Sequence, residues 1–98
     1  MRLRGKTDDN QNEIVLALRE AGCQVLSLAA LGAGVPDLLV LRGLRIYMLE
    51  VKDGSKSVSR QRLTPDQVRF HALWPVVKVV TSVEEALAAV GAIACPNQ

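Results

Sequence analysis

The sequence has little of what several protein classes require. Its two cysteines, Cys23 and Cys95, stand at opposite ends of the 98 residues without metal or redox spacing, so we expect reduced, structural thiols. No apolar run reaches the roughly 18–20 residues of a membrane span, and no signal peptide is visible, which predicts a cytoplasmic protein. With only three aromatic residues, stacking on single-stranded bases is not expected to dominate any nucleic-acid binding.

What is present suffices for one small folded domain. Hydrophobic residues make up 49% of the 98 positions, which favours a packed core over disorder. We expect a single domain over residues 1–98, with loose ends at 1–8 and 95–98. A chain this short leaves little room for an internal pocket, so an open cleft or a dimer interface is the expected kind of site.

Positive charge is unevenly distributed although the net charge is only +2. No lysine or arginine follows Lys78. Nine of the twelve basic residues lie in two segments: Arg2, Arg4 and Lys6, then Arg42, Arg45, Lys52, Lys56, Arg60 and Arg62. A one-sided basic surface favours a polyanion such as DNA, and an ordinary solvated surface is the alternative.

The pattern of apolar residues, turns and caps predicts the order α-β-β-β-α-β-α. The expected helices and strands cover 10–21, 23–28, 37–41, 45–52, 64–74, 76–81 and 82–94. Asn10 to Glu13 fits a helix start, and Thr64 to Gln67 forms a capping box with proline at the first helical position. We expect buried strands at 23–28 and 76–81, a flexible loop at 29–35 and a loop at 53–63. The strand–helix–strand step predicts a mixed sheet.

Three charged residues interrupt the most apolar stretch of the chain. Asp37 follows Pro36 at the start of the first hairpin strand, and Glu50 and Lys52 lie near the end of the second. Residues two apart on a strand share a face, and the neighbouring antiparallel strand can bring a second carboxylate to that face. Because buried charges are usually paired or bind a metal, the pattern suggests a metal-dependent phosphodiesterase.

These segments resemble a known nuclease group. "PD" at 36–37 followed by "EVK" at 50–52 is similar to the PD-(D/E)xK nuclease superfamily, and "GVPDLLV", "YMLEVKDG" and "LTPDQVRFHALW" resemble its virus-type replication-repair nuclease (VRR-NUC) family in the minimal, stand-alone form of phages and bacteria. The resemblance covers about residues 10–90. It implies an α/β, restriction-endonuclease-like α-β-β-β-α-β core, with a mixed sheet flanked by helices and a C-terminal helix, in a phage- or bacterium-encoded protein of the host cytoplasm.

The site residues suit catalysis with Mg²⁺ or Mn²⁺. Asp37 and Glu50 are oxygen ligands of the kind these ions prefer, and Val51 can add its backbone carbonyl. A bound ion would activate a water and neutralise charge on the scissile phosphate. Lys52 would orient the attacking water or stabilise charge at phosphorus. The alternative is a turn aspartate followed by the polar face of a half-exposed strand.

Two helix residues are expected near this site. The resemblance implies that Gln67 reaches the metal water or phosphate, although its capping role alone explains a glutamine there. It also implies an acidic residue on the first helix, for which Glu13 is the candidate and Asp9 a weaker one. A helix-start acid that complements the helix dipole is the alternative interpretation of Glu13.

The remaining candidates concern DNA contact. Lys56, Arg60 and Arg62 follow the metal-site strand and could bind phosphates, or they could simply be solvated. His71, the single histidine, follows Gln67 by one helical turn; a structural or exposed role is the expectation for it. Trp74 is expected in the core or an interface.

The sequence therefore predicts a Mg²⁺- or Mn²⁺-dependent DNA endonuclease. The resemblance adds a preference for branched DNA or Holliday junctions. A homodimer would place two sites in antiparallel relation, and the last helix and the hairpin edge are candidate interfaces. Two alternatives are a non-catalytic nucleic-acid-binding module with a nuclease-like fold and an accessory protein acting through protein contacts.

Overall fold

The computed structural model describes residues 9–56 and 61–93. In chain order the elements are α1 (Asp9–Glu20), β1 (Gln24–Ser27), the 3-10 helix η1 (Ala29–Leu31), β2 (Leu38–Arg42), β3 (Arg45–Val51), α3 (Pro65–Leu73), β4 (Val77–Val80) and α4 (Val83–Ala89). This order confirms the predicted α-β-β-β-α-β-α arrangement and the α/β fold class.

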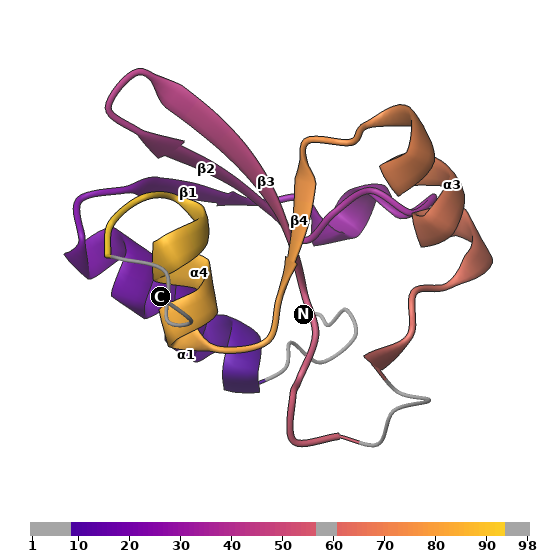
Figure 1. The fold of residues 1–98 in the computed structure, drawn as a ribbon, viewed down its shortest axis with the longest axis horizontal. Coiled ribbons are helices and arrows are strands. Elements are labelled where there is room, and N and C mark those ends of the chain that lie inside the picture. Colours follow the sequence, from indigo (N-terminus) through magenta and orange to yellow (C-terminus); the bar gives the residue numbers. More distant parts are fainter. Residues whose placement is uncertain (1–8, 57–60, 94–98) are drawn as a thin grey trace.

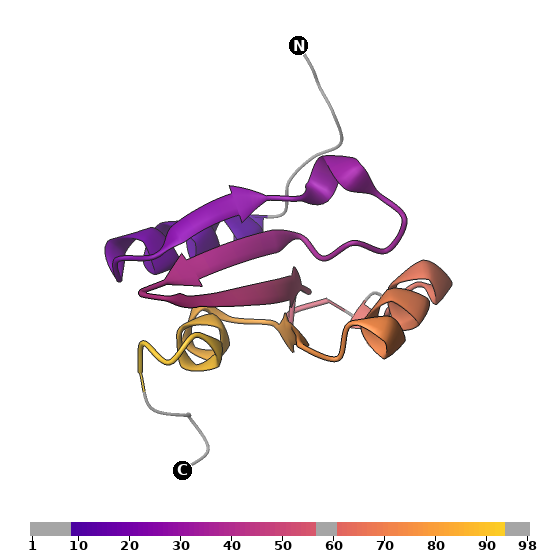
Figure 2. The ribbon, with the colours of Figure 1, turned by 90° about the horizontal axis from the view of Figure 1, so that it is seen from above.

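One mixed sheet organises these elements (Figures 1 and 2). Its strand order is β1-β2-β3-β4, with antiparallel pairing from β1 to β3 and parallel pairing of β3 with β4. The β2–β3 hairpin turns at Gly43 and Leu44, as the sequence predicts. The two central strands are therefore the pair that carries the suspected site.

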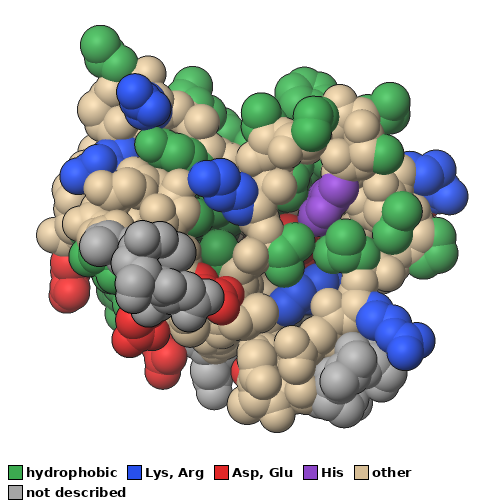
Figure 3. Space-filling view, viewed as in Figure 1, with side chains coloured by type: hydrophobic (Ala, Val, Ile, Leu, Met, Phe, Trp, Pro, Cys, Tyr) green, Lys and Arg blue, Asp and Glu red, His purple; other side chains and the backbone are tan. Residues whose placement is uncertain are grey.

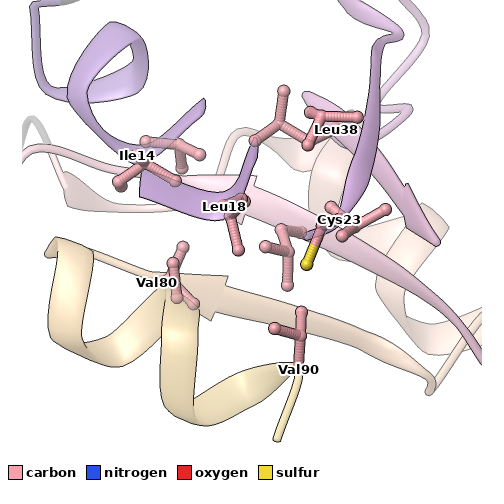
Figure 4. Close-up of a cluster of buried hydrophobic side chains, with 11 residues drawn as sticks. Ile14, Leu18, Cys23, Leu38, Val80 and Val90 are labelled. Atoms are coloured by element: carbon pink, nitrogen blue, oxygen red, sulfur yellow. The ribbon is translucent and has the colours of Figure 1, made fainter. Parts of the chain in front are cut away.

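The hydrophobic core lies between one face of the sheet and helices α1 and α4, which lie side by side (Figure 1). Ile14 and Leu18 are four residues apart on α1, so both point to the same face, and both are fully buried. They meet the inward residues of the strands and the buried residues of α4 (Figure 4). The core cluster comprises Ile14, Leu18, Cys23, Val25, Leu38, Val40, Leu49, Val51, Val80, Ala86 and Val90.

The opposite face of the sheet has many exposed apolar side chains. Strand register places Leu26, Leu39 and Met48 in one row and Leu41 and Ile46 in the next. Leu26 is 61% and Ile46 66% exposed. We call the residues Leu26, Leu39, Leu41, Ile46, Met48 and Val79 the open sheet face.

Several predicted elements differ in the structure. Both edge strands are less buried than expected, because an edge strand has a neighbour on one side only: β1 buries Val25 alone and β4 buries Val80 alone. The segment expected as a flexible loop contains η1. Helix α4 ends at Ala89 rather than near 94, with Val90 as its C-cap.

Cys23 is buried and reduced, and burial raises the pKa of its thiol. Cys95 lies outside the described residues. Within residues 9–56 and 61–93, no helix has the length and apolarity that a bilayer crossing needs.

Candidate active site

The hairpin brings the two suspected carboxylates to one place. Because Leu38 of β2 pairs with Leu49 of β3, Asp37 stands opposite Glu50 at the end of the same strand pair. Residues that pair directly across antiparallel strands share a face. That face is the open one, since Leu38 and Leu49 point into the core.

Glu50 is 2% exposed, the only buried charged residue in the described part of the chain. Its Oε2 accepts a hydrogen bond from Gln67 Nε2 at 3.1 Å, while its Oε1 is buried without a partner. Burial and the negative charge of Asp37 raise the pKa of Glu50 to about 8, and the Lys52 charge offsets only part of this. The positive charge around Glu50 is therefore too small to stabilise its ionised form fully.

Asp37 is half-buried and locked to the neighbouring strand. Its Oδ2 accepts a hydrogen bond from the Val51 backbone N–H at 2.8 Å, and its own carbonyl accepts one from Leu28 N–H at 2.7 Å. The first of these contacts joins the residue just before β2 to β3. Asp37 is therefore held beside Glu50 by both its side chain and its backbone.

Lys52 is fixed through its backbone and its ammonium. Its N–H donates to Val80 O at 2.9 Å, and its carbonyl accepts from Asn10 Nδ2 at 2.9 Å. Its Nζ donates to Gln67 Oε1 at 3.0 Å and lies 3.9 Å from Glu50 Oε2, an ion pair too long for a hydrogen bond. The ammonium thus stands next to the buried carboxylate with its direction set by Gln67.

Gln67 caps α3 and also contacts the site, while its contact with a metal water or phosphate stays a prediction. With Thr64 it forms the expected capping box at the start of α3: Thr64 Oγ1 accepts from Gln67 N–H, and Gln67 Oε1 accepts from Thr64 N–H. The same amide bridges Lys52 and Glu50. The cap holds the amide in the orientation that the bridge needs.

The other suspected metal-site residues are less closely placed. Glu13 is exposed on α1, and the described residues contain no group of three or more His, Cys, Asp or Glu side chains that could hold a metal. The structure therefore does not bring Glu13 together with Asp37 and Glu50. The backbone of Asp9 begins α1, but its side chain lies outside the described part. Val51 donates its N–H to Asp37, and the role of its carbonyl stays a prediction.

The suspected DNA contacts lie beyond the site. Lys56 and Arg62 are exposed on either side of the 57–60 segment, and Arg60 falls outside the described residues. Gln61 Nε2 donates to Lys56 O at 2.7 Å and so ties the two described parts of this connection together. Exposed lysine and arginine at this position are suited to phosphate contact.

His71 of α3 and Trp74 just after it differ in exposure. His71 Nε2 is buried without a partner, and burial together with the Lys52 charge lowers the pKa of the imidazole. Figure 3 shows the histidine in a hollow among hydrophobic side chains, with Lys or Arg side chains close by. Trp74 is 50% exposed and stacks on Phe70 at 5.5 Å between ring centroids, so it is not a core residue.

Sequence reasoning missed the role of Asn10. It predicted a helix-capping residue, but Asn10 lies within α1 and its Nδ2 donates to the carbonyls of both Lys52 and Thr81. These acceptors are 42 and 71 residues away in the chain. A local capping pattern cannot reveal such a contact, because it depends on how α1 docks on the sheet.

Comparison with known proteins agrees with this geometry. The family model described as archaeal Holliday junction resolvase (Hjc) matches residues 2–74. The chain belongs to the Hjc family. A solved VRR_NUC domain is also similar to this Hjc-family chain, with a TM-score of 0.58, 28% sequence identity, and coverage of 82% of this chain and 88% of that one. A search of curated proteins gave no match.

Both matches name nuclease families and confirm the resemblance that the sequence carries. The matched solved domain has the same nuclease fold as this member of the Hjc family. The Hjc-family chain is accordingly a nuclease, and nucleases of the PD-(D/E)xK type generally use divalent metals.

Proposed function

We propose that this protein is a Mg²⁺- or Mn²⁺-dependent endonuclease that hydrolyses phosphodiester bonds in branched DNA, with the four-way Holliday junction as its leading substrate. The similarity to the Hjc family supports the junction, and that to the VRR_NUC domain supports the nuclease chemistry. The observation that carries the proposal is the buried, unpartnered Oε1 of Glu50 beside Asp37.

The residues present fit a divalent cation. Two carboxylates share one face, one of their oxygens is buried without a donor, and proximity to Asp37 together with burial disfavours the negative charge of Glu50. Carboxylate and carbonyl oxygens are the ligands that Mg²⁺ and Mn²⁺ prefer. Asp37 and Glu50 would hold the ion, with the Val51 carbonyl as a further ligand. When bound, the ion supplies Lewis-acid stabilisation of the phosphate and a water of lowered pKa.

Lys52 and Gln67 act on the phosphate side of the site. The Lys52 ammonium stabilises the negative charge that develops at phosphorus or orients the attacking water. Gln67 holds that ammonium in place through the 3.0 Å bond to its Oε1, and its Nε2 fixes the orientation of Glu50. The side chains are therefore oriented before DNA binds, which lowers the entropic cost of reaching the transition state.

DNA binding relies on residues around this centre. Lys56, Arg60 and Arg62 would contact backbone phosphates after the metal-site strand. A homodimer through the open sheet face would supply two sites for the two strands that a junction resolvase cuts. From the sequence, the last helix and the hairpin edge were the expected interfaces instead, and the last helix is less suitable, because Ala86 and Val90 turn toward the core.

The test is cleavage of labelled single-stranded, duplex, flapped and four-way DNA in Mg²⁺, Mn²⁺ and EDTA, with the wild type and Lys52→Ala. We expect four-way DNA to be cut fastest, EDTA to stop cleavage, and Lys52→Ala to lose about 10²- to 10³-fold in rate while it still binds DNA. Lys78→Ala, which removes an exposed lysine of β4, is the matched control and should cut normally. Wild-type cleavage by Lys52→Ala would refute the assignment.

A non-catalytic nucleic-acid-binding module is the second candidate. The observation in its favour is that the described residues offer two carboxylates at the site and no third ligand of the His, Cys, Asp or Glu type. Calorimetry with Mn²⁺ separates the two functions. Binding that disappears in Glu50→Ala supports the nuclease, whereas junction binding without Mn²⁺ binding supports the module.

A further inference from the structure

The loop that carries Asp37 also packs closely against α3, the helix that carries Gln67. Gly34 lies three residues before Asp37, and its φ of +82° is in the left-handed region that favours glycine. A Cβ placed on Gly34 would overlap the backbone carbonyl of Asp66 and lie 2.9 Å from Gln67 N. Only a residue without a side chain allows the loop and the first turn of α3 to approach this closely.

Helix α3 has few other means of being held. None of its residues is buried, and Gln67 is the residue of α3 that hydrogen-bonds to the site strand. The amide of Gln67 can bridge Lys52 and Glu50 only while the α3 backbone stays at its present distance from β3. The close backbone contact at Gly34 limits how the first turn of α3 can be placed.

We propose that Gly34 is a positioning residue for the active site: its missing side chain lets α3 dock closely enough for Gln67 to hold Lys52 and Glu50 together. The inference rests on the proposed function for its consequence in cleavage, but its geometry can be tested without DNA or metal. A side chain at residue 34 should move the Gln67 amide away from both partners. Metal-site chemistry should then suffer although no residue that touches substrate has changed.

The chain offers a matched control in the same loop. Gly32 also has a positive φ, of +64°, so Gly32→Ala strains the backbone as well, but nothing lies within 4 Å of the added Cβ. Backbone strain should therefore lower the melting temperature of both variants by roughly 5 °C. Only Gly34→Ala should also displace α3. The two variants separate strain from positioning.

The first measurement is the NMR signal of the Gln67 side-chain amide in the metal-free protein, assigned by its loss in Gln67→Ala. We expect Gly34→Ala to shift it and Gly32→Ala to leave it in place. An unchanged amide signal in Gly34→Ala, or equal shifts in both variants, would overturn the proposal. Failure of the proposed function would instead appear as undiminished cleavage by Lys52→Ala, which leaves this measurement unaffected.

The second measurement is cleavage of four-way DNA with binding measured separately in EDTA. Since small displacements of catalytic groups are costly, we expect Gly34→Ala to lower the cleavage rate about tenfold with DNA affinity within about twofold. In the Gln67→Ala background, Gly34→Ala should add less than about a twofold loss, because the bridge is already absent. Full additivity would contradict positioning through Gln67.

If Gly34→Ala is unfolded in plain buffer, both measurements are repeated in trimethylamine N-oxide, which favours the folded state. A chain that stays unfolded there, while Gly32→Ala folds, would assign the contact to folding and overturn the positioning role.

Discussion

Glu50 combines burial, a neighbouring carboxylate and an ammonium that only partly compensates for them. Its Oε2 is bonded to Gln67, but its Oε1 has no donor, and its pKa rises to about 8. Lys52 stands 3.9 Å away rather than in hydrogen-bond contact. Ionised Glu50 thus destabilises the folded state when no cation is bound. The stability of the protein should therefore respond to metal binding at the carboxylate pair.

This arrangement predicts a pH dependence of stability in EDTA. Because the folded pKa of Glu50 lies above the unfolded value of 4.5, the folded state holds an extra proton between pH 4.5 and about 8. The contribution of this group is full below pH 4.5 and is lost as the pH rises toward 8. We expect Glu50→Gln to exceed the wild-type melting temperature at pH 8 by roughly 5 °C, with the difference shrinking toward pH 5.

Thermal unfolding in EDTA at several pH values measures this difference. Glu20→Gln, which neutralises an exposed glutamate at the end of α1, is the control and should follow the wild-type profile. Parallel curves for Glu50→Gln and the wild type would show that Glu50 gains no proton on folding.

Among single residues, the sequence was sufficient to predict the placement of those that belong to a local motif. Asp37, Glu50 and Lys52 could be paired from strand periodicity alone, and the hairpin register agrees. The contacts of Asn10 and the close approach at Gly34 could not be predicted in this way. Both depend on how a helix docks against a distant segment, which no local spacing encodes.

Helix α3 shows how one element can connect folding to chemistry. Its start is fixed by Thr64 and Pro65, and the residue that completes the cap is the same Gln67 that bridges Lys52 and Glu50. Helix α4 begins with a comparable cap, in which Ser82 Oγ accepts from Glu85 N–H, but it has no contact with the site among the described hydrogen bonds.

The two caps therefore make a matched pair of variants. Thr64→Ala and Ser82→Ala should each cost about 1 kcal/mol of stability, because each removes the acceptor of a helix N-cap. Only Thr64→Ala should slow DNA cleavage, by up to about fivefold if the same free energy is lost from the Gln67 bridge. Urea unfolding and cleavage rates measure the two effects, and equal cleavage by both variants would count against the coupling.

At the scale of elements, the sequence interpretation was wrong about how deeply two strands are buried. Segments 23–28 and 76–81 were expected to be buried because they are rich in apolar residues, yet β1 and β4 lie at the two edges of the sheet. Val79 of β4 is 44% exposed on the open sheet face, and Val76, just before β4, is 62% exposed. Apolar composition identifies a strand well, but it does not tell which strand is an edge strand, since that depends on the pairing of all four.

For the whole molecule, the most consequential feature is that helices α1 and α4 cover one face of the sheet (Figure 1), while strand register places Asp37 and Glu50 on the other. The open sheet face continues from the site row of Asp37 and Glu50 toward the hairpin. Leu44 at the hairpin turn is fully exposed, and Ile46 next to it is 66% exposed. Contiguous exposed apolar surface of this kind commonly marks an interaction site.

A second copy on this face would bring two sites close to the interface, and this predicts the behaviour of Ile46→Lys. A charge placed at the centre of an apolar interface is not paired, so we expect Ile46→Lys to be monomeric across the micromolar range, where we expect the wild type to be a dimer. Leu16→Lys provides the control, because Leu16 is 61% exposed on α1, away from the open sheet face.

Sedimentation gives the mass of each species, and four-way DNA labelled on each strand reports whether cuts are paired. The monomer should nick single strands, because each subunit has one site, whereas the dimer should cut two strands in one binding event. A wild type that sediments as a monomer but still makes paired cuts would exclude this face as the dimer interface and the dimer as the cutting unit.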